Sequence, residues 1–197
     1  MKLLLKSVIC AFVISCVISM TGFYGACRNI EKEVFRLHIL ANSDSKSDQQ
    51  LKLKVRDGIT EYTSALFRNC KNKAESVKAA EDNIENIKSF AQQIVYENGY
   101  NYNVDAYITN MSFNTRAYEN FTLPAGNYDA LRIVIGSGNG KNWWCMIYPA
   151  LCIPSASTVK LSDAVNAPEH DIVTQSDKYE VKFKIVELFE SLFSLFR

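Results

Sequence analysis

Histidine is scarce in this sequence of 197 residues, and no two cysteines have the C-x-x-C spacing of a zinc site. The two histidines are His38 and His170, so a metal site of histidine and cysteine ligands is not expected. Basic and acidic side chains nearly balance, with 22 Lys and Arg against 21 Asp and Glu. Because no basic stripe is present, the sequence predicts no nucleic-acid partner. We therefore expect neither a metal, nor another cofactor, nor a nucleic acid.

Charge is absent from Ser7 to Ala26, and Lys2 and Lys6 precede this apolar segment. A helix of about 20 residues is just long enough to cross the hydrocarbon core of a membrane. A basic start followed by an apolar stretch predicts that residues 1–26 are a signal peptide or a membrane anchor that exports the rest. Gly25 and Ala26 are small enough to precede a cleavage site, whereas Tyr24 is not. Cleavage, retention and a lipid on Cys27 all stay open.

The remaining residues, 30–197, are numerous enough for a single domain with its own core. Glu33 to Ala41 has the composition of a strand. Apolar residues at helical spacing then predict one helix from Ser47 to Asn69 and another from Asn72 to Asn98. Ser47 with Gln50, and Asn72 with Glu75, have the spacing of capping boxes, and Gly99 marks a helix end. Two helices joined by so short a link are expected to pack antiparallel.

From Tyr100 onward the apolar period changes to two, which is typical of strands. The expected strands are Val104–Phe113, Tyr118–Leu123, Tyr128–Ile135 and Trp143–Tyr148. Short turns between them predict an antiparallel meander, with the Gly136–Lys141 loop as a hairpin and not a phosphate-binding loop. Residues 155–176 are polar and are expected to be irregular. The fold class is therefore α+β, with an antiparallel sheet covered by two antiparallel helices.

The last segment, Lys178 to Arg197, has the pattern of an amphipathic helix. Its expected apolar stripe consists of Val181, Ile185, Leu188, Leu192 and Leu195.

Cys145 and Cys152 lie seven positions apart on either side of Pro149. Since Pro149 cannot continue a central strand, the chain is expected to turn there and bring the two sulfur atoms together. Outside the cytoplasm such a pair is oxidised, so we expect a disulfide. The alternative is an exported cysteine hydrolase in which Cys145 is the nucleophile and His170 or His38 its base. The sequence assigns no role to Cys70.

Three stretches carry a resemblance to a known family. They are RLHILANSDSKSDQQLKLKVRD from Arg36, YENFTLPAGNYDAL from Tyr118, and GNGKNWWCMIYPALC from Gly138. With the closing KFKIVELFE, they resemble the stage II sporulation protein R family of endospore-forming bacteria. The resemblance covers nearly the whole chain from Arg36 onward.

The resemblance implies a signalling protein and not an enzyme. Members of this family are made in the forespore and exported into the space between the two sporulating compartments. There they activate a membrane-embedded aspartic-type protease of the mother cell, which removes the pro-sequence of sigma-E. We expect the same partner and the same location here, with the chain in contact with the membrane through its N-terminal segment before or without cleavage.

Two segments are candidates for contact with this partner. Asn42, Ser43 and Asp44 follow a strand, and Trp143 and Trp144 stand beside a glycine-rich loop. Neighbouring residues of a strand point to opposite faces, so the two tryptophans are not expected to enter one core. One of them is expected on the outer face of the sheet or under the C-terminal helix. The alternative for Asn42 and Asp44 is that they cap the adjoining loop.

Overall fold

The computed structural model describes residues 2–118, 121–149 and 165–194. The chain separates into two compact units. Unit 1 contains residues 1–31, 112–126 and 165–197, and unit 2 contains residues 32–111 and 127–164. This division does not follow the expected boundary after residue 26, and the single domain of residues 30–197 stays a prediction.

A four-stranded sheet with the order β2-β5-β1-β6 forms the centre of unit 2. Its strands are β1 (Phe35–Leu40), β2 (Val104–Phe113), β5 (Gly126–Ile135) and β6 (Asn142–Tyr148). β1 pairs parallel with β5 and antiparallel with β6, so the sheet is mixed. The α+β class is confirmed, and the expected antiparallel sheet is wrong.

β1 lies between β5 and β6 in the sheet and is buried on both faces. All six of its residues are buried, which is typical of a strand with neighbours on both sides and parallel pairing. The expected meander joined β5 directly to β6, but β1 separates them. The Gly136–Lys141 loop therefore crosses the end of β1 and does not close a hairpin.

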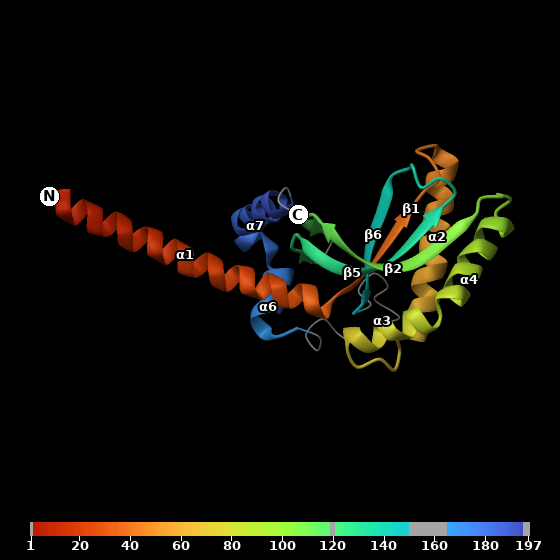
Figure 1. The fold of residues 1–197 in the computed structure, drawn as a ribbon, viewed down its shortest axis with the longest axis horizontal. Helices are drawn as coiled ribbons and strands as arrows, with labels where there is room; N and C mark the ends of the chain where they lie inside the picture. Colours follow the sequence, from red (N-terminus) through yellow and green to blue (C-terminus); the bar gives the residue numbers. More distant parts are fainter. Residues whose placement is uncertain (1, 119–120, 150–164, 195–197) are drawn as a thin grey trace. The chain divides into compact units, whose positions relative to one another are not determined.

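Three helices follow β1 in unit 2, namely α2 (Lys46–Leu66), α3 (Lys73–Asp82) and α4 (Ile84–Glu97). Figure 1 shows α2 and α4 side by side next to the sheet, and α2 also contacts β1 and β6. Tyr62 of α2 stacks on Phe90 of α4, with ring centroids 5.1 Å apart. The shared core contains Phe35, Leu37, Ile39, Leu51, Val55, Ile59, Ile87, Ala91, Val95, Leu131, Ile133, Cys145 and Ile147.

The helix ends differ in detail from the expected ones. Ser45, not Ser47, caps α2, because its hydroxyl accepts a hydrogen bond from the Asp48 backbone N–H. The cap at Asn72 is confirmed by a bond of 2.9 Å from the Glu75 N–H. The expected helix from Asn72 to Asn98 is interrupted at Asn83, whose side-chain amide donates to the Ala79 carbonyl. Asparagine often competes in this way with the backbone bonds of a helix.

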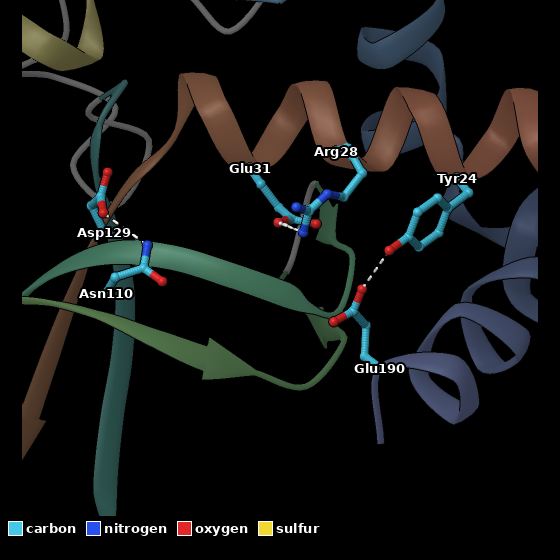
Figure 2. A network of polar contacts seen from close by, with 6 residues as sticks. All are labelled: Tyr24, Arg28, Glu31, Asn110, Asp129 and Glu190. Atoms are coloured by element: carbon cyan, nitrogen blue, oxygen red, sulfur yellow. Dashed lines mark hydrogen bonds and ion pairs between the residues drawn. The ribbon is translucent and has the colours of Figure 1, made fainter. Parts of the chain in front are cut away.

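Polar contacts tie α3 and β2 to β5. The Asn110 side-chain amide of β2 donates to the Asp129 carboxylate of β5 at 2.9 Å, as drawn in Figure 2. The ammonium of Lys73, in the first turn of α3, lies 2.7 Å from the other carboxylate oxygen of Asp129. This carboxylate therefore receives one neutral and one charged donor.

Unit 1 contains most of α1 (Lys2–Glu33), a two-stranded sheet and the C-terminal helices. β3 (Arg116–Ala117) and β4 (Thr122–Leu123) pair antiparallel, so the expected continuous strand from Tyr118 to Leu123 is wrong. The Tyr118 N–H donates to the Phe121 carbonyl at 2.7 Å. The helices are α6 (Ala167–Thr174), the 3-10 helix η1 (Ser176–Tyr179) and α7 (Glu180–Ser194).

Helix α6 lies in a segment that was expected to be irregular. Pro168 in its first turn and Glu169 beside it are ordinary signals of a helix start. Only residues 155–164 of that segment lie outside the described residues.

The C-terminal helix is confirmed, but its expected apolar stripe is not the buried one. Val181 and Leu188 are exposed, whereas Phe183 and Val186 are buried. Apolar residues at helical spacing lie on more than one face of this helix, so periodicity alone does not say which face packs. Leu195 lies outside the described residues, and the side chain of Leu192 is not described.

The first half of α1 exposes apolar side chains. The exposed ones include Leu4, Val8, Ile9, Phe12, Ile14 and Ile18. Among the residues that the structure describes, no helix meets the length and hydropathy required of a membrane span. The signal peptide or anchor of residues 1–26 stays a prediction.

Candidate functional site

Asn42, Ser43 and Asp44 form the loop after β1, and the structure accounts for their side chains by internal contacts. The Asn42 side-chain oxygen accepts a hydrogen bond from the Ser137 N–H at 3.0 Å. The Asp44 carboxylate accepts one from the Lys141 N–H at 2.7 Å. This loop therefore holds both ends of the glycine-rich loop that joins β5 to β6.

Asp48 is the buried centre of this arrangement. Its carboxylate accepts hydrogen bonds from the Asn42 side-chain amide at 3.0 Å and from the Ser43 hydroxyl at 2.6 Å. Burial alone raises the pKa of Asp48, but hydrogen bonds from Ser43, Asn42, Tyr102 and Ser45 lower it below its ordinary value. Asp48 is therefore held as a carboxylate that fixes the first loop.

Lys52, one turn further along α2, binds the Gly136–Lys141 loop. Its ammonium donates to the Lys141 carbonyl at 2.8 Å and to the Gln49 side-chain oxygen at 2.6 Å. The residue is 4% exposed, and burial lowers the pKa of Lys52 while the nearby Asp44 carboxylate partly offsets this. Lys141 is thus bound at its N–H by Asp44 and at its carbonyl by Lys52.

Glycines allow the two loops to approach each other. Gly136 and Gly138 have φ values of +59° and +65°, which side chains rarely tolerate. A Cβ on Gly140 would collide with the backbone carbonyl of Ser43. Gly140 therefore allows a close approach to the Ser43 backbone, and Gly136 and Gly138 supply the left-handed turns of the loop.

Trp143 and Trp144 lie on opposite faces of β6, as the sequence predicts. Trp143 packs against the core beneath the helices, with the Arg56 guanidinium 4.4 Å from the centre of its ring. Trp144 stacks on His38, with ring centroids 4.2 Å apart and planes at 12°. Both tryptophans are half-buried.

The two candidate segments lie at the same end of the sheet. Leu40 of β1 pairs with Asn142 of β6, and Ile39 pairs with Trp143. The Asn42–Asp44 loop begins where this pairing ends. The structure thus brings together the five residues that the sequence singles out, and their contact with a partner stays a prediction.

The face of the sheet opposite the helices carries one buried and one half-buried arginine that sequence reasoning did not single out. Arg36 of β1 is fully buried, and its guanidinium lies 5.0 Å from the centre of the Tyr128 ring. Arg132 of β5 lies 5.9 Å from the ring centre of Tyr107. The available signal was the alternation that places Arg36 and His38 on one face of β1.

His38 is neutral in this surrounding. Burial, first of all, and the charge of Arg132 lower its pKa to about 4; a hydrogen bond with Asn142 offsets part of this, and Arg36 lowers it further. A group whose folded pKa lies below its unfolded value of about 6.5 makes unfolding easier as the pH falls between the two values.

We therefore expect the free energy of unfolding of unit 2 to fall by about 2 kcal/mol between pH 7 and pH 5 because of His38 alone. His38→Phe keeps an aromatic ring against Trp144 but does not titrate. Chemical denaturation of both proteins at the two pH values measures the effect. An equal loss of stability in the variant would show that another group is responsible.

Cys145 and His38 do not form a catalytic pair. Cys145 is 1% exposed and pairs with Leu37 in the core beneath the helices, whereas His38 stacks on Trp144 on the other face. His170 lies on α6 in unit 1. Cys152 lies outside the described residues, so its disulfide with Cys145 stays a prediction. Cys70 is a free, half-buried thiol.

Within the described parts of the chain, no three histidine, cysteine or acidic side chains come together in a way that would hold a metal ion. The hydrogen bonds that join the Asn42–Asp44 loop, Asp48 and the Gly136–Lys141 loop form what we call the loop network. Its carboxylates, those of Asp44 and Asp48, already accept hydrogen bonds from amide and hydroxyl donors. The arrangement at the end of the sheet is thus a polar surface whose carboxylates accept internal hydrogen bonds.

Residues 31–158 match the family model of stage II sporulation protein R. The chain is also 31% identical to the stage II sporulation protein R of Bacillus subtilis (strain 168) in an alignment of 187 positions that covers 84% of each protein. It therefore belongs to the stage II sporulation protein R family. No solved structure matches it.

Proposed function

We propose that this chain is an exported sporulation signal that activates a membrane-embedded aspartic-type protease of the mother cell. That protease then removes the pro-sequence of sigma-E. The observation that carries the proposal is membership of the stage II sporulation protein R family over most of the chain. The separation of Cys145 from His38 gives the cysteine-hydrolase alternative no support.

Export is the second part of the proposal. Lys2 and Lys6 followed by the uncharged stretch from Ser7 to Ala26 support delivery from the forespore into the space between the two membranes. In that space the loop network would meet the extracytoplasmic surface of the protease. A surface that is already ordered loses less conformational entropy on binding. The bond of Asn42 to Asp48 and that of the Lys141 N–H to Asp44 hold this surface in place.

A sporulating bacterium that lacks its own stage II sporulation protein R tests the proposal. This chain is expressed there in the forespore, and the protease and pro-sigma-E of the organism from which the chain comes are expressed in the mother cell. We expect a sigma-E-dependent reporter in the mother cell to switch on. A reporter that stays off, although the chain is exported and folded, would contradict the proposal.

The contact surface is proposed to contain the Asn42–Asp44 loop and one of the two tryptophans. A substitution at Asp44 can separate an effect on partner contact from an effect on folding. Asparagine at this position keeps an oxygen that can accept from the Lys141 N–H but removes the negative charge. We expect Asp44→Asn to leave the melting temperature within about 2 °C and to lower pro-sigma-E processing several-fold. Immunoblotting of sigma-E and thermal denaturation measure the two effects.

Asp82→Asn is the matched control. Asp82 is an exposed carboxylate at the end of α3, and the Lys78 ammonium of the same helix donates to it at 3.0 Å. We expect this change to affect neither melting nor processing. Equal processing by the Asp44 and Asp82 variants would place the contact elsewhere.

A further inference from the structure

The second half of α1 is part of the core of unit 1. Phe23 is 4% exposed, and Cys27 and Ile30 are fully buried. Their spacing of four and three places them on one face of the helix. That face packs within the unit, whereas Phe12 and Ile18 in the first half of the same helix are exposed.

Phe23 has the most extensive surroundings of these residues. Its ring stacks on Tyr179 at a centroid distance of 5.5 Å and meets Phe183 edge-on at 5.3 Å. The Lys182 ammonium lies 5.6 Å from the ring centre and donates to the Ser19 hydroxyl at 2.8 Å. Phe23 therefore packs α1 against both η1 and α7.

Polar contacts continue this attachment along the helix. Figure 2 shows Tyr24 and Glu31 on α1, with the Tyr24 hydroxyl donating to Glu190 of α7 at 2.9 Å. The Asn29 side-chain amide donates to the Glu169 carboxylate of α6 at 3.1 Å, and Glu169 is buried. Both C-terminal helices thus depend on α1 for hydrogen bonds as well as for apolar contact.

Cleavage after Ala26 would remove Phe23 and Tyr24 from this core. It would also place a charged amino terminus on Cys27, which is fully buried. Burying an unpaired charge is costly, and the first backbone N–H groups of the shortened helix would lose their partners. Burial, together with the charge of Glu31, also raises the pKa of the Cys27 thiol to about 12, so this cysteine is poorly placed to react with a lipid donor.

We infer that α1 from Phe23 onward is a permanent part of the exported protein, and that neither cleavage after Ala26 nor lipid attachment at Cys27 takes place. The segment that directs export is then continuous with a helix that the folded signal needs. The inference rests on the proposed export, and it changes what the partner meets: a protein whose N-terminal helix is a structural element and not a discarded leader.

The N-terminus of exported molecules tests this directly. Surface lysines of sporulating cells are labelled with a membrane-impermeant reagent, and all labelled forms of the chain, whatever their length, are isolated and their intact masses measured. We expect every labelled species to begin at or before Phe23 and to carry no acyl group on Cys27. A folded species that begins after Phe23, or one acylated at Cys27, would overturn the inference.

A second measurement does not depend on export. Phe23→Ala and Phe12→Ala remove the same side chain from the two halves of α1, and the purified full-length proteins are melted in mild detergent. We expect Phe23→Ala to lower the melting temperature by at least 5 °C, and Phe12→Ala to leave it unchanged. Equal melting of the two variants would overturn the inference. If the melting temperatures differ as expected but no labelled chain is recovered from the cells, the result counts against export alone.

Discussion

Replacing Asp48 with alanine is expected to lower the free energy of unfolding of unit 2 by about 3 kcal/mol. The change removes an acceptor that is 4% exposed and leaves the Asn42 amide and the Ser43 hydroxyl without their partner. A buried donor that loses its acceptor keeps the full penalty of its desolvation. Urea denaturation followed by circular dichroism measures the loss.

Glu61→Ala is the matched control for Asp48→Ala. Glu61 lies on the same helix, is exposed and is acidic. Its removal is expected to change the free energy of unfolding by less than about 0.5 kcal/mol. If the two variants unfold alike, the loop network does not stabilise the unit and the description of Asp48 as its centre fails.

Gly140→Ala is expected to be as damaging, with a loss of about 3 kcal/mol. Its Cβ would overlap with the Ser43 carbonyl, which belongs to the backbone and cannot rotate away. The Gly140 N–H also donates to the Ala41 carbonyl at 2.9 Å, so a displaced loop loses this bond. We expect the Asn42–Asp44 loop to move with it, and signalling to fall together with stability.

Gly58→Ala shows whether crowding alone explains such a loss. A Cβ on Gly58 of α2 would meet the end of the Ile94 side chain, which can turn aside, and alanine favours a helix over glycine. We expect a change of less than about 1 kcal/mol in the same denaturation experiment. A larger loss at Gly58 than at Gly140 would contradict the backbone contact described for Ser43.

Strands could be predicted from local patterns, whereas their pairing could not. β1, β2, β5 and β6 lie close to their expected ranges because alternation and apolar runs are local properties. The loop of Gly136–Lys141 is short, which favoured a hairpin. Two strand spacings make only about 10 Å, however, so six residues can also cross one intervening strand. The pairing of β1 with both β5 and β6 distinguishes the two arrangements, and it is not a local property of the sequence.

Helix faces and breaks depended on contacts that the sequence does not state. Ser45 and Ser47 both precede the apolar pattern of α2, and the bond of Ser45 to Asp48 decides between them. The break at Asn83 comes from a side-chain bond to the preceding turn. The helical periodicity predicts Val181 and Leu188 on the packed face, but Phe183 and Val186 are the buried residues.

The candidate site was predicted in part. The opposite orientations of Trp143 and Trp144 followed from strand geometry and are confirmed. That the Asn42–Asp44 loop caps its neighbours was the weighed alternative, and the hydrogen bonds of Asn42 and Asp44 now support it. Their roles in partner binding depend on a second molecule, about which one sequence carries no direct information.

Activation of a protease by a non-catalytic ligand is the central claim, and reconstitution outside sporulation tests it most directly. The full-length chain, the membrane protease of its organism and pro-sigma-E are produced together in a bacterium that does not sporulate. Removal of the pro-sequence is measured by immunoblot. We expect removal only when the chain and an intact protease are both present, and unchanged removal with His170→Ala. Removal without the chain, or by the chain when the active-site aspartates of the protease are replaced, would contradict it.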